Sequence, residues 1–398
     1  MTTNASGLPP KTVARVRGQT PGISGRIHFD NSGSALMPEP VIAALHHAIE
    51  RDAAVGGYVA QEQQASAMEG GYASLAKLLG GNISDYAFVG SAVDGWTKAF
   101  YSLPLKAGEN IVTAYNEYCS NYIAYLQVQK NRGVEIRVAR QSPAGGVDLE
   151  HLTALIDRRT ALISLSHMPS SSGEINPVEK VGEIACAAGV LYQLDACQSV
   201  GHVPVDVGRI GCDIMTGTSR KFLRGPRGIG FLYVNEKARS VMEPVVLTNQ
   251  SAEWSSKDAY TLRQDARVFE AWERSVANQL GFSAAIDYLL ELGVESATAQ
   301  IAQNAAYLRE RFADMKNIKV ECPPNAASAI ITFNVDGHTP AEVKNILEQQ
   351  NIAVQTASVV HTRLDLEERG ITAAVRVSPH YYNDVGEMDT LLAALESL

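Results

Sequence analysis

The feature that most constrains the fold of this chain is a regular alternation of short apolar segments with helical patterns. Seven segments have the length and apolar content of buried strands, at residues 86–89, 110–114, 134–138, 161–165, 190–195, 214–217 and 229–234. Helical patterns lie between most of them, for example over 147–156 and over 178–188, where Pro177 marks the start. This alternation predicts an α/β fold, with a mostly parallel seven-stranded sheet that helices cover on both faces.

The pattern changes after Glu270. Long helices are expected at 275–292 and 296–313, strands at 329–335, 353–357 and 374–377, and two further helices at 340–349 and 385–398. We therefore expect three parts. These are an N-terminal arm over residues 1–45 that joins the small domain, a large domain over 46–285 and a smaller α+β C-terminal domain over 286–398.

Composition excludes several classes of function. Charged residues make up 19% of the 398 residues and the net charge is −9 with no basic stripe, so a nucleic-acid partner is not expected. The five cysteines form no CxxC pair, which argues for a reducing compartment and against a metal site. Residues 1–20 lack the apolar core of a signal peptide, and no apolar run approaches a membrane span. The sequence therefore predicts a cytoplasmic protein with small-molecule partners.

One acid and one lysine stand where two of the predicted strands end. Asp195 closes the strand at 190–195, and Lys221 follows the strand at 214–217 and precedes a Gly-rich segment at 225–228. Open α/β sheets bind ligands at the carboxyl ends of their strands. A lysine amine can form a Schiff base with the aldehyde of pyridoxal phosphate, and a carboxylate can keep the pyridine nitrogen protonated. The pair therefore predicts a pyridoxal phosphate site, and the alternative is a solvated surface lysine.

These residues carry a resemblance to a known family. The chain resembles class V aminotransferase-type proteins of the fold-type I pyridoxal phosphate superfamily, in the branch of cysteine desulfurases, isopenicillin N epimerase-like proteins and C–S lyases. The likeness runs from residue 27 to the final helix. It is strongest at Asp-Ala-Cys-Gln (195–198), at Ser-Arg-Lys (219–221) with Gly-Pro-Arg-Gly (225–228), and at Arg-Val-Ser-Pro-His (376–380).

The resemblance implies roles around the cofactor ring. Lys221, Asp195 and Tyr118 would be catalytic, with Asp195 on the pyridine nitrogen. Gln198 would hydrogen-bond the ring oxygen beside the Schiff base. Tyr118 stands where desulfurases stack a histidine on the ring, and either flat side chain can stack. A tyrosine of the core is the alternative for Tyr118.

The turn at 90–94 is expected to bind the cofactor phosphate, because a strand-to-helix turn offers free N–H groups and a positive helix end. Ser91, Ala92 and Val93 form this turn. Val93 replaces a threonine that desulfurases use there, so more of the binding is expected to fall on Ser91, Thr218 and Arg220. A guanidinium can hold two phosphate oxygens, and an ion pair at the helix edge is the alternative for Arg220.

The resemblance also implies a place for the substrate. Arg376 would bind the α-carboxylate through a bidentate contact, and a structural arginine is the alternative. Substrate contacts are further expected from Asn31, Tyr58 and His380, and a tight turn beside the dimer interface is the alternative for Tyr58. The resemblance implies a homodimer with active sites near its interface.

The absence of one cysteine narrows the range of reactions that this chain is expected to catalyse. Desulfurases carry a nucleophilic cysteine on a loop after a strand of the 353–355 type, and this chain has valine there, in the stretch Thr-Ala-Ser-Val-Val-His (356–361). Transfer of sulfur to an enzyme cysteine is therefore not expected, and Cys119 and Cys197 are interpreted as small packing groups.

The remaining chemistry favours a C–S β-lyase that acts on an S-substituted cysteine or its sulfoxide. The motifs at 55–60, 117–121, 219–221 and 378–380 together resemble the lyases that cleave hercynylcysteine sulfoxide in ergothioneine biosynthesis. The alternatives are an epimerase or racemase like isopenicillin N epimerase, a class V aminotransferase, and a catalytically silent binding module. Intact Lys221, Asp195 and Arg376 argue against the last of these.

Overall fold

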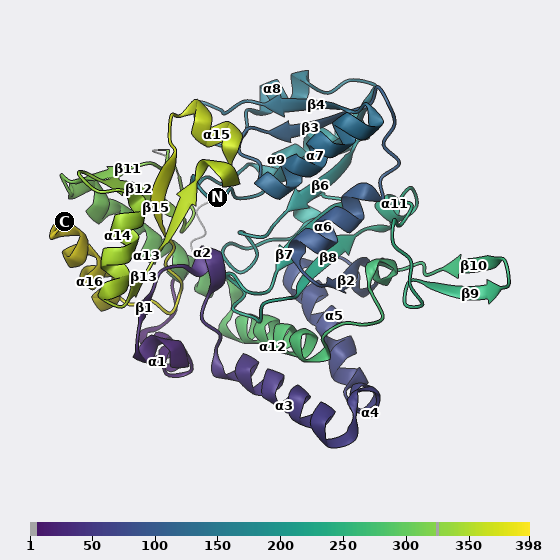
Figure 1. Cartoon of the computed structure of the whole chain (residues 1–398), viewed down its shortest axis with the longest axis horizontal. Coiled ribbons are helices and arrows are strands. Elements are labelled where there is room, and N and C mark those ends of the chain that lie inside the picture. The colour runs from purple at the N-terminus through teal and green to yellow at the C-terminus, as the bar shows by residue number, and fades with distance from the viewer. Residues whose placement is uncertain (1–5, 324–325) are drawn as a thin grey trace.

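The structure is a computed structural model that describes residues 6–323 and 326–398. Its centre is a seven-stranded sheet in the order β2-β8-β7-β6-β5-β3-β4 (Figure 1). The strands are β2 (Tyr86–Val89), β3 (Asn110–Ala114), β4 (Glu135–Ala139), β5 (Thr160–Ser166), β6 (Leu191–Asp195), β7 (Ile214–Thr218) and β8 (Gly230–Val234). β8 runs antiparallel to β2 and β7, and the other neighbouring pairs are parallel. The predicted α/β fold with a mostly parallel seven-stranded sheet is confirmed.

Two apolar layers cover this sheet because its strands are apolar on both faces. In β2, Tyr86 and Phe88 belong to one core cluster, while Ala87 and Val89 belong to the other. Helices α6 (Ala92–Tyr101) and α7 (Cys119–Arg132) contribute to the second cluster. The first cluster draws on helices α5 (Ala65–Leu79), α8 (Leu149–Ala154), α9 (Val178–Ala188) and α12 (Val276–Leu292).

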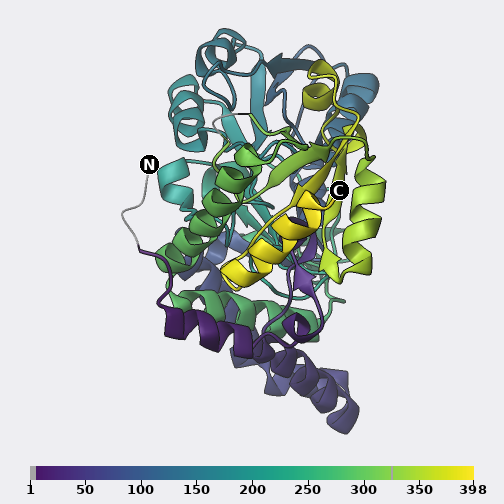
Figure 2. The ribbon, with the colours of Figure 1, turned by 90° about the vertical axis from the view of Figure 1, so that its left-hand side faces the viewer.

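A second, antiparallel sheet forms the core of the C-terminal part. Its strands, in order, are β11 (Ile318–Val320), β12 (Ile331–Val335), β15 (Ala373–Val377) and β14 (Gln355–Ser358). Helices α13 (Val294–Asp314), α14 (Pro340–Gln349) and α16 (Val385–Glu396) contribute to its core, and Figure 2 shows α16 in yellow beside α13 in green. The remaining helices of four or more residues are α1 (Pro10–Gly18), α2 (Asn31–Ser34), α3 (Glu39–Val55), α4 (Gly57–Gln63), α10 (Val207–Ile210), α11 (Glu236–Arg239), α15 (Arg363–Glu368), η1 (Pro21–Ser24) and η3 (Ala266–Phe269).

The N-terminal segment pairs with this C-terminal part. β1 (Ile27–His28) runs parallel to β13 (Ile352–Ala353), and Asp30 bridges to Ser378. The single strand expected at 353–357 is wrong, because residues 352–353 pair with β1 whereas Gln355–Ser358 turns to pair with β15. The expected domain boundary near 285 falls inside α12, which packs against α3 and α5, and it stays a prediction.

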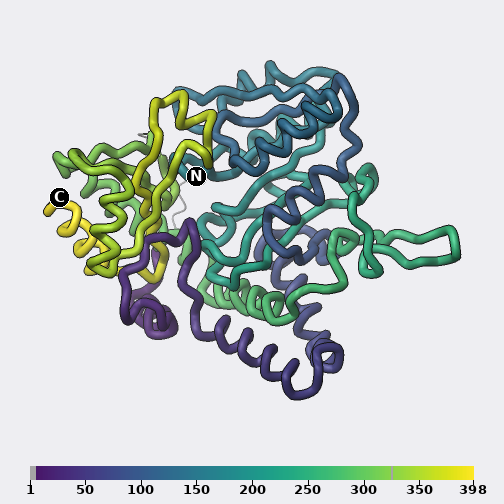
Figure 3. Tube along the Cα trace, viewed as in Figure 1, coloured from purple at the N-terminus to yellow at the C-terminus, as the bar shows by residue number. Residues whose placement is uncertain are grey.

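A hairpin arm, defined here as residues 245–272, projects from the body (Figures 1 and 3). It carries β9 (Ala252–Ser256) and β10 (Ala259–Leu262), which the sequence did not reveal. Trp254 and Tyr260 on the hairpin are 79% and 60% exposed. Of the helices in residues 6–323 and 326–398, none is both long and apolar enough to cross a membrane.

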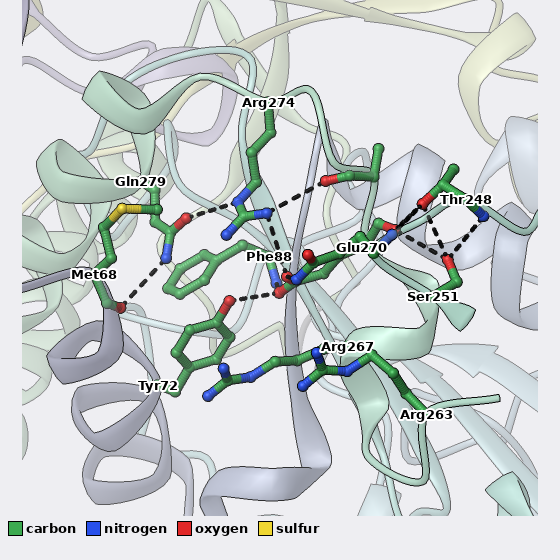
Figure 4. Close-up of polar contacts among 12 residues, drawn as sticks. Met68, Tyr72, Phe88, Thr248, Ser251, Arg263, Arg267, Glu270, Arg274 and Gln279 are labelled. Atoms are coloured by element: carbon green, nitrogen blue, oxygen red, sulfur yellow. Dashed lines mark hydrogen bonds and ion pairs between the residues drawn. The ribbon is translucent and has the colours of Figure 1, made fainter. Parts of the chain in front are cut away.

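The base of the arm is fixed by Glu270 (Figure 4). Its buried carboxylate accepts hydrogen bonds from the Tyr72 hydroxyl at 2.7 Å and from Phe88 N at 2.8 Å. Its backbone carbonyl accepts a hydrogen bond from the Ser251 hydroxyl at 3.3 Å, and the Arg267 guanidinium lies over the Tyr72 ring. These contacts tie the C-terminal end of the arm to α5 and β2, and they join Ser251 to that end.

Candidate active site

The fold brings the predicted acid and lysine into one pocket. β6 and β7 are parallel neighbours with Asp195 opposite Thr216, and Lys221 follows β7 in the connection to β8. Both residues therefore lie at the carboxyl edge of the sheet, where the strand order places ligand sites. The same pocket is lined by the predicted residues Ser91, Ala92, Val93, Tyr118, Gln198, Thr218 and Arg220, and by Trp96, Asn121, Ser166, Met168, Ser170, Cys197, Gly228 and Ile229.

Two hydrogen bonds fix the Asp195 carboxylate. Oδ1 accepts a bond from Cys197 N at 2.9 Å, and Oδ2 accepts one from Asn121 Nδ2 at 3.0 Å. Each oxygen keeps acceptor capacity for a protonated ring nitrogen. The sequence analysis did not include Asn121 among the site residues, because its bond to Asp195 spans 74 positions of the chain.

The Lys221 amine lies in an environment that favours its neutral form. Burial lowers its pKa to about 8, with a further lowering from Arg220, while the Asp195 charge acts in the opposite direction. A neutral amine is the form that attacks an aldehyde or takes a proton from carbon. Lys221 therefore suits both roles near neutral pH.

The turn between β2 and α6 forms one end of the pocket. Ser91 caps α6, with its Oγ accepting a hydrogen bond from Asp94 N at 3.0 Å. A Cβ on Gly230 would lie 2.8 Å from Ala92 N and 2.6 Å from Gly217 O, so the turn and the start of β8 pack backbone to backbone. Thr218 and Arg220 line the pocket with this turn, and the Arg220 guanidinium donates to Gly33 O. This end offers hydroxyls, helix N–H groups and a cation, a donor set that fits a phosphate.

The Gln198 amide is open toward a ligand. Its Nε2 donates to Ser32 O at 3.2 Å, but its buried Oε1 has no hydrogen-bond partner in the part of the chain that the structure describes. Tyr118, at the N-cap of α7, lines the same pocket, and burial raises the pKa of its hydroxyl. The pocket therefore fits pyridoxal phosphate. It offers the free amide oxygen of Gln198, the flat ring of Tyr118, the acid, the lysine and a set of donors for the phosphate.

Arg376 adjoins the pocket. It lies in β15, and its Nη1 donates to the carbonyl of the pocket residue Ser170 at 3.2 Å. Its Nη2 lies 3.2 Å from Asp30 Oδ1, and its buried Nε has no partner among the described residues. The guanidinium thus keeps an unused donor, which suits the predicted contact with a substrate carboxylate.

Two predicted substrate contacts, Asn31 and His380, do not line the pocket, and their role toward the substrate stays a prediction. His380 is fully buried, with Nε2 3.1 Å from Phe222 O, Nδ1 accepting from Tyr381 N and its ring stacked on Phe222. Asn31 is also fully buried, and it donates to Ser378 O at 2.7 Å and accepts from the Tyr382 hydroxyl. The polar groups of both residues thus bond inside the protein, at the junction between the N-terminal segment and the C-terminal part.

Tyr58 is placed differently. It lies on α4 with 70% of its surface exposed, and it does not line the pocket of its own chain. Its predicted contact with substrate stays a prediction that depends on a second copy of the chain.

No cysteine occupies the stretch where a desulfurase nucleophile is expected. Residues 355–361 form β14 and a short 3-10 helix, η4 (Val359–His361), and Val360 is 56% exposed. Cys197 does line the pocket, but burial, together with the Asp195 charge, raises the pKa of its thiol well above the ordinary value. The thiol is therefore neutral and a poor nucleophile.

Comparison with known proteins identifies the family of this chain. Residues 27–391 match the family model described as Aminotransferase class-V. The chain therefore belongs to the class-V aminotransferase family, and pyridoxal 5'-phosphate is its cofactor.

Relatives in this family cover nearly the whole chain. A probable cysteine desulfurase of Methanothermobacter thermautotrophicus is 27% identical over 391 residues, which are 96% of this chain and 97% of that protein. The apo structure of cysteine desulfurase from Thermococcus onnurineus NA1 has a TM-score of 0.90 and 26% identity, covering 99% of this chain and 98% of that chain. The cystine C–S lyase C-DES, solved with its product cysteine persulfide, shares the fold with a TM-score of 0.85 at 18% identity, covering 96% of this chain and 100% of that chain.

Proposed function

We propose that this protein is a C–S β-lyase that converts an S-substituted L-cysteine, or its sulfoxide, to pyruvate, ammonia and a sulfur product. The observation that supports the proposal is a pocket that is lined by Lys221 and Asp195 and adjoined by Arg376, in a chain that has valine where a desulfurase has its nucleophile. The cysteine that does reach the pocket, Cys197, has a thiol held neutral by burial. Sulfur therefore has to leave without being transferred to the enzyme.

Each residue has a defined task in this reaction. Pyridoxal phosphate, when bound, accepts the electron pair left at the substrate α-carbon. Lys221 removes the α-proton, Asp195 holds the proton on the ring nitrogen, and Arg376 fixes the α-carboxylate. Loss of the sulfur group from the β-carbon leaves aminoacrylate, and water converts this to pyruvate and ammonia. Relatives named cysteine desulfurase and cystine C–S lyase support the assignment to C–S cleavage.

The test is an assay of products over a panel of substrates. S-alkyl cysteines, cystine, cysteine and hercynylcysteine sulfoxide are incubated in deuterated water with the wild-type protein and with Lys221→Ala as the inactive control. The proposal predicts pyruvate and ammonia in equal amounts with the sulfur product, and no persulfide on any enzyme cysteine. Alanine with an enzyme persulfide would instead indicate desulfuration. Intact substrate labelled with deuterium at an inverted α-carbon would indicate racemisation, and a keto acid that retains sulfur would indicate transamination.

We also propose that the protein is a homodimer. Large apolar side chains are exposed at two projections, the corner between α3 and α4 and the hairpin arm. The first carries Ile49, Tyr58 and Val59, and the second carries Trp254 and Tyr260. Large apolar side chains exposed on projections of the fold favour a protein interface there.

A further inference from the structure

Glu117 is connected to Asp195 through Asn121 and does not itself line the pocket. It is 3% exposed, between β3 and α7. Its Oε1 accepts hydrogen bonds from Tyr118 N at 2.7 Å, Asn121 Nδ2 at 3.1 Å and Ser166 Oγ at 2.5 Å. A buried carboxylate that receives three donors on one oxygen is held in a single orientation.

Asn121 joins this carboxylate to Asp195. The same Nδ2 that bonds Glu117 donates to Asp195 Oδ2 at 3.0 Å, so the amide uses one proton on each acid. Rotation of the amide would break both bonds at once. Glu117 therefore fixes Asn121, and Asn121 fixes the plane of the Asp195 carboxylate.

We propose that Glu117 and Asn121 are positioning residues for the cofactor, which orient Asp195 and add negative charge behind it at the ring-nitrogen end of the pocket. The inference rests on the place of Asp195 in the proposed function, but it does not require that the reaction be C–S cleavage. The proposed role of Glu117 differs from a purely structural one. A carboxylate in this position has an electrostatic effect on the group that Asp195 binds.

The surroundings of Glu117 are polar but contain few charges. Asp195 faces it from β6, Tyr125 from α7 and Tyr192 from β6, while Thr113 Oγ1 lies 3.2 Å from its Oε2. Burial raises the pKa of Glu117 to about 7, and the Asp195 charge adds to the effect. The carboxyl is thus ionised above neutral pH and protonated below it.

The contacts also locate the proton. Oε1 already accepts three hydrogen bonds, so the proton belongs on Oε2. The Tyr125 hydroxyl lies 3.2 Å from Oε2 and donates to Ser164 Oγ at 2.7 Å, which leaves its oxygen free to accept. Protonation of Glu117 therefore leaves the bridge through Asn121 intact and changes only the charge.

Glu117→Gln is the direct test, because it keeps the side-chain shape and removes the charge. The pyridoxal phosphate form is titrated from pH 5 to 10 while the visible absorbance of the bound cofactor is followed. The midpoint of the spectral transition should move to lower pH by about one unit, because a nearby negative charge no longer stabilises the protonated cofactor.

Glu174→Gln is the matched control. Glu174 is another buried glutamate of the same domain, held by Tyr115, Gln141, Ser172 and the backbone of Gly146, but it does not line the pocket or bond Asp195. Its substitution should leave the spectral midpoint unchanged even if stability falls.

Asn121→Ala provides a second, independent variant if Glu117→Gln does not fold. Loss of the bridge should raise the dissociation constant of pyridoxal phosphate about tenfold, since Asp195 loses one of its two fixing donors. An unchanged midpoint in Glu117→Gln, an unchanged affinity in Asn121→Ala, or an equal shift in Glu174→Gln would overturn the inference. A wild-type protein that binds no pyridoxal phosphate would instead refute the proposed function, so the two failures are distinguishable.

Discussion

Lys221 differs from a surface lysine because burial holds its pKa near 8 rather than at the ordinary value of 10.5. Its neutral fraction therefore rises tenfold per pH unit up to about pH 8 and then levels off. We expect the rate at which pyridoxal phosphate becomes attached to the apoprotein to follow the same curve. Stopped-flow absorbance from pH 6 to 10 measures it, with free Nα-acetyl-lysine as the control. A rate that keeps rising to pH 10, as for the free amine, would contradict the assigned environment.

A second prediction at the residue scale concerns the role of Arg376 in substrate binding. Arg376→Lys keeps the charge but loses the planar fork, so kcat/KM should fall about ten- to a hundredfold while cofactor content stays normal. Arg369→Lys is the matched control, because Arg369 binds Asp365 in the same C-terminal part and does not line the pocket. Equal activity in the wild type and Arg376→Lys would make Arg376 a structural residue.

Site residues that stand at the ends of apolar strands could be predicted from the sequence. Those whose role depends on contacts between distant segments could not. Asp195 and Lys221 were accessible because a buried strand leading to an acid or a lysine is visible in the sequence. Asn121 belongs to the motif at 117–121, but its contact with Asp195 was not accessible, because the bond joins distant segments. His380 was assigned to substrate from its motif, whereas its ring nitrogens point to backbone groups, and side-chain direction is not visible in a motif.

At the scale of elements, the strands of the large sheet were predictable because most of them are apolar and buried on both faces, and the more exposed edge strand β4 is the exception to this burial. The hairpin β9–β10 was not, because its residues are mostly exposed and its pattern is weak. The division of residues 352–358 into β13 and β14 was also not predictable from the sequence. It depends on the pairing of β13 with β1 and of β14 with β15.

The close approach of β8 to the phosphate turn yields a prediction about elements. Gly230→Ala would place a methyl group 2.6 Å from Gly217 O and 2.8 Å from Ala92 N, so backbone has to move. We expect a loss of about 1–3 kcal/mol in the free energy of unfolding and weaker cofactor binding. Gly70→Ala on α5, where nothing lies within 4 Å, should be neutral or stabilising by up to about 1 kcal/mol. Chemical denaturation measures the free energy of unfolding, and cofactor titration measures the affinity for pyridoxal phosphate. Equal values of both quantities in the two variants would contradict the close packing of Gly230.

At the scale of the whole molecule, the exposed apolar projections predict a dimer. Sedimentation equilibrium should give twice the 42.8 kDa mass of one chain. Replacing Trp254 and Tyr260 together by serine should weaken association, since both side chains are mostly exposed on the hairpin arm. Val385→Ser, which alters an exposed apolar residue on α16, should not. A wild-type monomer at micromolar concentration would contradict the homodimer proposal.

The central claim is that Lys221 is the lysine that carries pyridoxal phosphate, in the pocket formed by Asp195, Gln198 and the turn at Ser91. The most direct measurement is reduction of the yellow holoprotein with borohydride, followed by peptide mapping by mass spectrometry. The pyridoxyl label should be found on Lys221, and Lys221→Ala should fold, lose the long-wavelength absorbance and take no label. A label on another lysine, or none on the wild-type protein, would contradict the claim.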